Sequence, residues 1–179
     1  TELQEGLMCT RMVRFGGMST RLRRIVRQTA RELGKEVNVE IEGEDNEVDR
    51  TVLDRMIAPL EHMLRNAVAH GIETPTDRLV AGKPETGKIN ILVGRQGPDV
   101  IVQVSDDGGG IDADAIRKKA IEQGLLDKDN QLTDHDVLQF ILKSGFSTAD
   151  SITQIAGRGV GMDVVDSEIK QLGGVLEID

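Results

Sequence analysis

Two short segments in which Ile or Val recurs at every second position restrict the fold of this chain more than any other feature. These segments, residues 89–93 and 100–104, have the pattern of strands with one buried face. Gly97, Pro98 and Asp99 lie between them and are common turn residues, so the pattern predicts a β-hairpin with a short loop.

Helical patterns occupy much of the sequence before this hairpin. A helix is predicted with Ser19 as its N-cap and Gly34 as its C-terminal stop, followed by a strand over 37–41. A long helix is predicted over 51–70, and Pro59 within it predicts a kink or a junction of two helices.

The sequence after this long helix continues the mixed pattern. Residues 74–87 predict mostly loop with one helical turn, and helices are predicted over 112–123, 134–143 and 160–172. Residues 176–178 predict the beginning of a strand, because Leu and Ile alternate there with a polar residue.

Strands and helices are mixed without strict strand–helix–strand alternation. This order favours an α/β fold, a two-layer sandwich in which helices cover one face of a mixed sheet. The length of 179 residues suits one domain, which we expect to span residues 16–179. Residues 1–15 have the pattern of the end of another element, followed by a break at Gly16 and Gly17.

Charge and composition exclude several classes of protein. The net charge of −9 disfavours nucleic acid as a partner, because its phosphates repel an acidic surface. Cys9 is the single cysteine, which excludes an intrachain disulfide and a cluster of thiolate metal ligands. No apolar run approaches the ~20 residues of a membrane helix, and no signal-peptide pattern is found. We therefore expect no membrane insertion and a cytoplasmic location.

The charge is distributed unevenly along the chain. Residues 11–31 contain seven arginines, whereas residues 36–49 are strongly acidic. The arginine-rich helix presents either a solvated face or a docking face for an acidic partner, and the sequence leaves both interpretations open.

The first of three motifs that suit a ligand lies near the end of the long predicted helix. His62, Asn66 and His70 are spaced by four residues, so they share one helix face. Such a stripe is either a solvated face, a hydrogen-bonded edge of the core, or a site for a magnesium ion and phosphate oxygens.

The second motif, residues 104–111, follows the hairpin directly. Asp106 ends the second strand, and the glycines at 108–110 allow a ligand to approach the backbone closely. The alternative is a tight turn with a solvated pair of carboxylates at Asp106 and Asp107.

The third motif places Gly157, Gly159 and Gly161 at the start of a predicted helix. Glycines at a helix N-terminus present backbone N–H groups to an anion, which suits a chain of phosphates. The spacing does not fit a Rossmann fingerprint, and the Lys-Ser/Thr pair of a P-loop is missing.

Taken in this order, the three motifs resemble the nucleotide-binding boxes of the CheA family of chemotaxis histidine kinases. Residues 62–71 resemble the N box, residues 106–110 the G1 box and residues 157–165 the G2 box, while residues 146–149 resemble the F box. Residues 2–12 resemble the tail of the family's dimerisation helix, so the resemblance covers nearly the whole chain.

The resemblance implies a fold and a set of site residues. The implied fold is the Bergerat-type sandwich that histidine kinases share with gyrase, MutL and a heat-shock chaperone family. Asp106 would bind the adenine amino group, Asn66 would coordinate Mg²⁺ between the phosphates, and His62 and His70 would contact the triphosphate. An ATP lid would span about 145–160. The implied cofactor-binding residues are Asp106, Gly108, Gly110, Ser147, Thr148, Gly157, Arg158, Gly159, Val160, Gly161 and Met162.

Two positions depart from the family pattern. Ala69 stands where many relatives have an acidic residue, which removes an acid that could orient His70. The family's sheet continues beyond the position of Asp179, so we expect the C-terminal strands to be incomplete.

The implied activity is transfer of the γ-phosphate of Mg-ATP to a histidine on a separate phosphotransfer domain. One alternative is an ATPase of the same superfamily, but those enzymes place Glu where this chain has His62, and Glu61 lies about 100° away around the helix. The other alternative is a degenerate scaffold pseudokinase, which the intact Asn66 and Asp106 disfavour.

The resemblance also implies partners. These are a histidine-phosphotransfer domain, a response regulator, a CheW-like coupling protein and chemoreceptors, with homodimerisation through an adjoining domain. His135 lies between two aspartates and is interpreted as a solvated residue rather than the phospho-acceptor.

Overall fold

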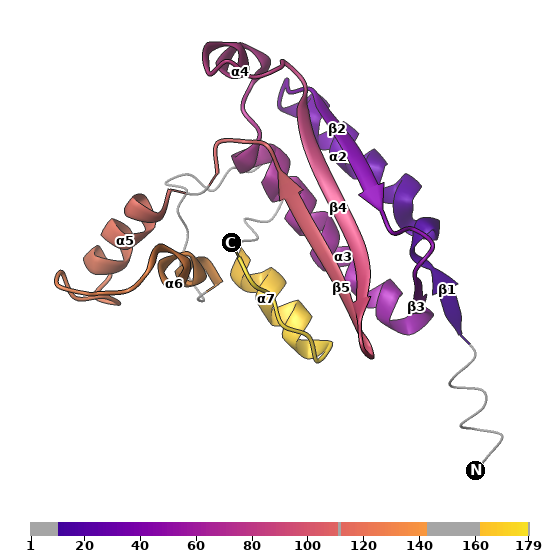
Figure 1. The fold of residues 1–179 in the computed structure, drawn as a ribbon. Helices are drawn as coiled ribbons and strands as arrows, with labels where there is room; N and C mark the ends of the chain where they lie inside the picture. The colour runs from indigo at the N-terminus through magenta and orange to yellow at the C-terminus, as the bar shows by residue number, and fades with distance from the viewer. Residues whose placement is uncertain (1–10, 111, 143–161, 179) are drawn as a thin grey trace. The chain divides into compact units, whose positions relative to one another are not determined.

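The computed structural model describes residues 11–110, 112–142 and 162–178. The chain divides into two compact units, Thr1–Gly109 and Gly110–Asp179, which are described separately below. The first unit holds all the strands of the described residues, and the second holds helices (Figure 1).

The main sheet of the first unit has three strands in the order β2-β4-β5. Strand β2 (Val37–Glu42) runs parallel to β4 (Gly87–Gln96), and β4 is antiparallel to β5 (Asp99–Asp106). Gly97 and Pro98 form the loop of the predicted hairpin, and Gly97 adopts a φ of 62°, which glycine tolerates without strain. The hairpin and the mixed sheet are confirmed.

Two helices, α2 (Ser19–Glu32) and α3 (Arg50–Asn66), cover one face of this sheet (Figure 1). Their apolar residues form one core with the alternate residues of the strands, as the sequence pattern predicts. The predicted α/β architecture with helices on one face is therefore confirmed. The buried members of this core are Phe15, Leu22, Val26, Ala30, Val48, Leu53, Leu60, Leu64, Val68, Ile72, Ile89, Ile91 and Val93.

A second, two-stranded sheet flanks the helices. Strand β1 (Met12–Arg14) pairs antiparallel with β3 (Glu47–Asp49), and a 3₁₀ turn, Phe15–Met18, leads from β1 into α2. The prediction that Ser19 caps this helix is wrong. Ser19 is the first helical residue, and its hydroxyl donates to Glu44 Oε1 at 2.7 Å instead of accepting from a backbone N–H group.

Helix α3 differs from its prediction in two respects. It runs as one α-helix through Pro59, so a junction of two helices at that residue is excluded. The α-helix ends at Asn66, and Ala67–Gly71 (η2) form a π-helical turn in which the Ile72 N–H group donates to the Ala67 carbonyl. His70 therefore lies in a widened turn, outside the regular helix that contains His62 and Asn66.

The segment between α3 and β4 contains helix α4 (Pro75–Val80). Thr74 caps it by accepting a hydrogen bond from the Asp77 N–H group, and Pro75 occupies the first turn, where its missing N–H is harmless. The single helical turn predicted for this segment is confirmed.

The second unit contains three helices among its described residues: α5 (Ala113–Glu122), α6 (Asp134–Leu138) and α7 (Met162–Gln171). The 3₁₀ turn Gln139–Leu142 (η3) continues α6. Ile116, Ala120, Val137 and Phe140 form the core of this unit. The strand predicted to begin with Leu176 and Ile178 is wrong, because residues 174–178 make no ladder with any strand of the described residues. No helix in the described ranges is long and apolar enough to cross a membrane.

Candidate functional site

Two of the three predicted motifs meet in the first unit. The turn that follows β5 lies against the end of the π-helical turn, where the Gly109 N–H group donates to the Gly71 carbonyl at 3.0 Å. A Cβ atom added to Gly108 would lie 2.0 Å from the same carbonyl oxygen. Glycine is therefore required at position 108 by the close approach of two backbone segments.

The Asp106 carboxylate lies at this contact. Its Oδ1 atom accepts a hydrogen bond from the Gly108 N–H group at 2.8 Å, which fixes the side chain above its own turn. A Cβ atom on Gly71 would lie 3.0 Å from Asp106 Oδ2. Within the described ranges, Asp106 Oδ2 accepts no protein hydrogen bond, and Asp106 is exposed. The carboxylate thus keeps one oriented acceptor for a ligand.

The polar residues of the first motif lie in α3 and in the π-helical turn that follows it. His62 and Asn66 are half-buried, and His70 is exposed in the π-helical turn. His62 and Asn66 lie in the regular α-helix, on the face that was predicted to hold all three residues. His70 lies beyond it, in the π-helical turn, where the number of residues per turn is larger.

Lys35 supports the π-helical turn from the end of α2. Its Nζ atom donates to the carbonyl oxygens of Val68 and Ala69, at 2.8 and 3.0 Å. Burial lowers the pKa of Lys35, and the nearby Glu73 carboxylate opposes this effect. Partial burial also lowers the pKa of His70, and the Lys35 charge adds to the shift. Both effects favour the neutral form of the His70 imidazole.

A cluster of charged residues that the motifs did not single out lies behind the Asp106 turn. Arg78 of α4 is completely buried, with 0% of its side chain exposed, and it binds both Glu73 and Asp107. Lys83 also binds Glu73, at 2.9 Å. Sequence spacing gave no signal for this cluster, because Asp107 comes from a segment more than 20 residues beyond Glu73, Arg78 and Lys83. The sequence could not predict that an arginine in a segment expected to be mostly loop would be buried.

The two carboxylates of this cluster are held in their charged forms. The hydrogen bond from Lys83 is the main reason why the pKa of Glu73 is lowered, with Arg78 contributing further attraction. Desolvation raises the pKa of Asp107, but hydrogen bonds from the Lys88 N–H group and from Arg78 outweigh it, so the net shift is downward.

Several predicted site residues lie elsewhere in the chain. Gly110, with a φ of 74°, begins the second unit, and Met162 is the first residue of α7. The following predicted residues lie outside the described ranges: Ser147, Thr148, Gly157, Arg158, Gly159, Val160 and Gly161.

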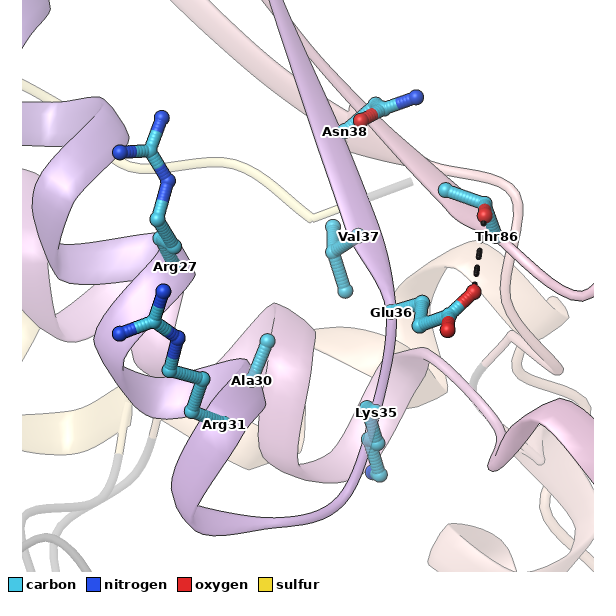
Figure 2. A pocket seen from close by; sticks show the side chains of 8 residues that line it. All are labelled: Arg27, Ala30, Arg31, Lys35, Glu36, Val37, Asn38 and Thr86. Atoms are coloured by element: carbon cyan, nitrogen blue, oxygen red, sulfur yellow. Dashed lines mark hydrogen bonds between the residues drawn. The ribbon is translucent and has the colours of Figure 1, made fainter.

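A separate hollow of about 290 Å³ opens between α2 and β2. Figure 2 shows Arg27 and Arg31 on successive turns of α2 beside it, and the Glu36 carboxylate bound to Thr86. Of the predicted site residues that the structure describes, none lines this hollow. It is therefore distinct from the contact between Gly71 and Asp106.

The donor set of the site suits one kind of metal binding. Among the residues described, no group of three or more His, Cys, Asp or Glu side chains could hold a metal ion. Asn66 offers a single amide oxygen, and Mg²⁺ is commonly bound by one or two protein ligands together with substrate phosphates and water. The residues therefore fit magnesium that arrives with a nucleotide.

Comparison with protein families assigns the chain. Residues 55–179 match the model of the histidine kinase-, DNA gyrase B- and HSP90-like ATPases. The chain belongs to this family. The matched region contains both motifs that meet at Gly71 and Asp106, so these motifs lie within the domain that defines the family.

Similarity to individual relatives extends across the whole chain. It is 44% identical over 177 residues to the chemotaxis protein CheA of Rhizobium meliloti, covering 99% of this chain and 23% of that protein. Identity is 41% to CheA of Treponema pallidum, covering 99% and 22%, and 41% to the sensor histidine kinase CheAY of Helicobacter pylori, covering 100% and 22%. These matches confirm the resemblance to CheA. The chain spans about a quarter of the length of these relatives.

Proposed function

We propose that this chain is the ATP-binding catalytic domain of a CheA-like sensor histidine kinase. It would transfer the γ-phosphate of Mg-ATP to a histidine on a separate phosphotransfer domain. The observation that carries the proposal is the Asp106 carboxylate, which is oriented by the Gly108 N–H group and has Oδ2 available beside Gly71, at the end of the π-helical turn that follows Asn66. This arrangement would bring an adenine acceptor and a magnesium ligand into one unit of the fold.

The geometry of Asp106 suits adenine recognition. A carboxylate with one oxygen satisfied by its own turn can direct the other toward the exocyclic amino group of adenine. The hydrogen bond would be charge-assisted, and it would be stronger than one made by a neutral amide. The glycines at 108 and 109 would let the flat base approach the backbone.

The helix side chains would act on the phosphates. Asn66 would hold Mg²⁺, which neutralises charge on the phosphates when bound, and His62 and His70 would donate hydrogen bonds to phosphate oxygens. The lowered pKa of His70 favours the neutral imidazole, which keeps one ring N–H for such a bond. The glycine-rich residues 157–161 are proposed to cover the phosphates as a lid, together with Ser147 and Thr148.

Phosphoryl transfer is favoured over hydrolysis by the environment of Glu61. An ATPase requires a carboxylate that can activate water, and the Glu61 carboxylate instead accepts a hydrogen bond from Arg21 Nε at 2.7 Å. Only 12% of its side chain is exposed. Transfer to an imidazole depends mainly on positioning and charge neutralisation, so it needs no such base.

The relatives' names suggest the setting of this activity. We propose that the complete protein acts in chemotaxis-type two-component signalling in the cytoplasm. Its partners would be a phosphotransfer domain, a response regulator, a CheW-like coupling protein and chemoreceptors, and an adjoining domain would form a homodimer.

The proposal is tested by calorimetric titration of the chain with Mg-ATP, alongside an assay of ATP hydrolysis. Wild-type protein is expected to bind in the micromolar to millimolar range with negligible hydrolysis, and Asp106→Asn and Asn66→Ala are expected to weaken binding. No binding by wild-type protein would refute the kinase assignment. Rapid hydrolysis would favour the ATPase alternative.

A further inference from the structure

Arg78 is the largest fully buried side chain in the described part of the chain. A buried cation is costly unless ion pairs and hydrogen bonds satisfy it. The guanidinium of Arg78 is satisfied by three segments of the first unit. Its Nε atom donates to the Pro84 carbonyl at 2.6 Å, Nη1 contacts Glu73 Oε1 and the Asp107 carbonyl at 3.4 Å, and Nη2 donates to Asp107 Oδ2 at 3.0 Å.

Asp107 is held at both carboxylate oxygens. Oδ2 accepts from Arg78, and Oδ1 accepts from the Lys88 N–H group of β4 at 2.9 Å. Lys83 adds a second cation, which donates to the carbonyl oxygens of Asp107 and Gly108, each at 3.0 Å. The turn after β5 is therefore fixed through side chains and backbone together.

The two carboxylates bound by Arg78 belong to the two segments that meet at the candidate site. Glu73 lies two residues after Gly71, and Asp107 lies directly after Asp106. Arg78 thus links the segment that follows the π-helical turn to the turn that bears Asp106, the proposed adenine acceptor. The Gly109–Gly71 hydrogen bond joins the same two segments two residues away along the chain from each attachment.

We infer that Arg78 and Asp107 are positioning residues for nucleotide binding, which act by holding the Asp106 carboxylate against the end of the π-helical turn. This inference rests on the proposed function. Neither residue needs to touch the nucleotide, because Arg78 is enclosed and both Asp107 oxygens are already occupied. Loss of either partner would release the turn and leave Asp106 to sample other orientations.

The test uses two variants of the full chain. Asp107→Asn keeps the shape of the side chain and removes its charge, and Arg78→Lys keeps the charge but loses the planar arrangement of donors. Each is expected to weaken Mg-ATP binding by about tenfold, a size typical of a lost pair within a coupled network. Calorimetry measures the dissociation constants at a temperature where circular dichroism shows every variant to be folded.

A double-mutant cycle distinguishes positioning from general destabilisation. If Asp107 acts through Asp106, then Asp107→Asn added to Asp106→Asn should change the Mg-ATP dissociation constant by less than about twofold. Amide hydrogen exchange at Gly108 and Gly109 should also accelerate in ligand-free Asp107→Asn. Leu53→Ala is the matched control, because it removes a core side chain in the first turns of α3, and it should lower the melting temperature while leaving the affinity unchanged.

The possible results distinguish a failure of the positioning role from a failure of the proposed function. Unchanged affinity in both Arg78→Lys and Asp107→Asn, with normal binding by wild-type protein, would overturn the positioning role and leave the kinase assignment intact. Full additivity of Asp106→Asn and Asp107→Asn would overturn it as well. Failure of wild-type protein to bind Mg-ATP would refute both.

Discussion

The Gly109 amide nitrogen lies 3.0 Å from the Gly71 carbonyl oxygen and donates a hydrogen bond to it. This one backbone contact joins the end of the helix segment that bears Asn66 to the turn that bears Asp106. It occurs because neither Gly71 nor Gly108 has a side chain to keep the two segments apart. The candidate site therefore depends on a close approach of two backbones as much as on its polar side chains.

Substitution of Gly108 should damage this contact. A Cβ atom at position 108 would lie 2.0 Å from the Gly71 carbonyl oxygen, so Gly108→Ala must push the turn away from η2. We expect a loss of about 2 kcal/mol or more in the free energy of unfolding, comparable to overpacking in a core, and weaker Mg-ATP binding. Urea denaturation and calorimetry measure the two effects.

Gly109 offers the matched control for this substitution. A Cβ atom there would have no heavy atom within 4 Å, and the residue is not among those with positive φ. Gly109→Ala should therefore change the stability by less than about 0.5 kcal/mol. Equal losses in the two variants would contradict the steric explanation.

The lowered pKa of His70 predicts a pH dependence of stability. Because folding disfavours the charged imidazole, the unfolded chain takes up this proton at a higher pH than the folded chain does. The native state should lose stability as pH falls below about 6.5, the ordinary pKa of His, until the folded state is protonated as well. Above that pH both states are neutral and His70 contributes no slope.

His70→Gln isolates this contribution. Urea denaturation of wild-type protein and variant should be measured between pH 7.5 and 5.5 (about two units spanning the ordinary His pKa). The difference between their free energies of unfolding should shift in favour of the variant toward the acidic end. A constant difference would show that His70 titrates alike in the folded and unfolded chains.

Much of the first unit follows from local sequence patterns. The hairpin over 87–106 was predictable because its alternation and its Gly97 turn agree with the tertiary structure. The widened turn at Ala67–Gly71 was not, because the pattern of apolar residues predicted a regular helix through His70 and gave no signal for a π-helical turn. Tertiary support from Lys35, which binds carbonyls of that turn, comes from a residue more than 30 positions away.

Prediction of the candidate site from the sequence was limited in the same way. Asp106, Gly108 and Asn66 were predicted from motifs, and the structure brings the two motifs into contact at Gly71. Arg78 was not predicted as a site residue, because its ion pairs join it to Glu73 and Asp107, and local sequence patterns do not show which charged side chains pair in the fold. The residues predicted for the lid remain predictions, since they lie outside the described ranges.

Removal of Lys35 should raise the pKa of His70. Burial is the main reason why that pKa is lowered and charge repulsion from Lys35 adds to it, so Lys35→Met should move it part of the way toward its ordinary value. The variant also removes two hydrogen bonds to the Val68 and Ala69 carbonyls, and it should cost about 1–3 kcal/mol in the free energy of unfolding. NMR titration of the His70 ring protons checks the pKa, and an unaltered value would contradict the electrostatic explanation.

The ion pair between Arg21 and Glu61 leads to a prediction about hydrolysis. The Arg21 side chain is 55% exposed, so its pair with Glu61 should contribute only about 0–1 kcal/mol to stability. Arg21→Met therefore releases Glu61 without unfolding the chain. If Glu61 faces away from the nucleotide, as its place about 100° around the helix from His62 implies, ATP hydrolysis should stay negligible in this variant.

The complementary substitution sharpens this test. His62→Glu places a carboxylate at the position where the superfamily's ATPases have Glu, so hydrolysis should rise measurably above wild-type in a coupled phosphate-release assay. His62→Gln is its control, because it changes the same position without adding a general base. Hydrolysis that rises in Arg21→Met but not in His62→Glu would identify Glu61 as a water-activating base, and the kinase assignment would then give way to an ATPase.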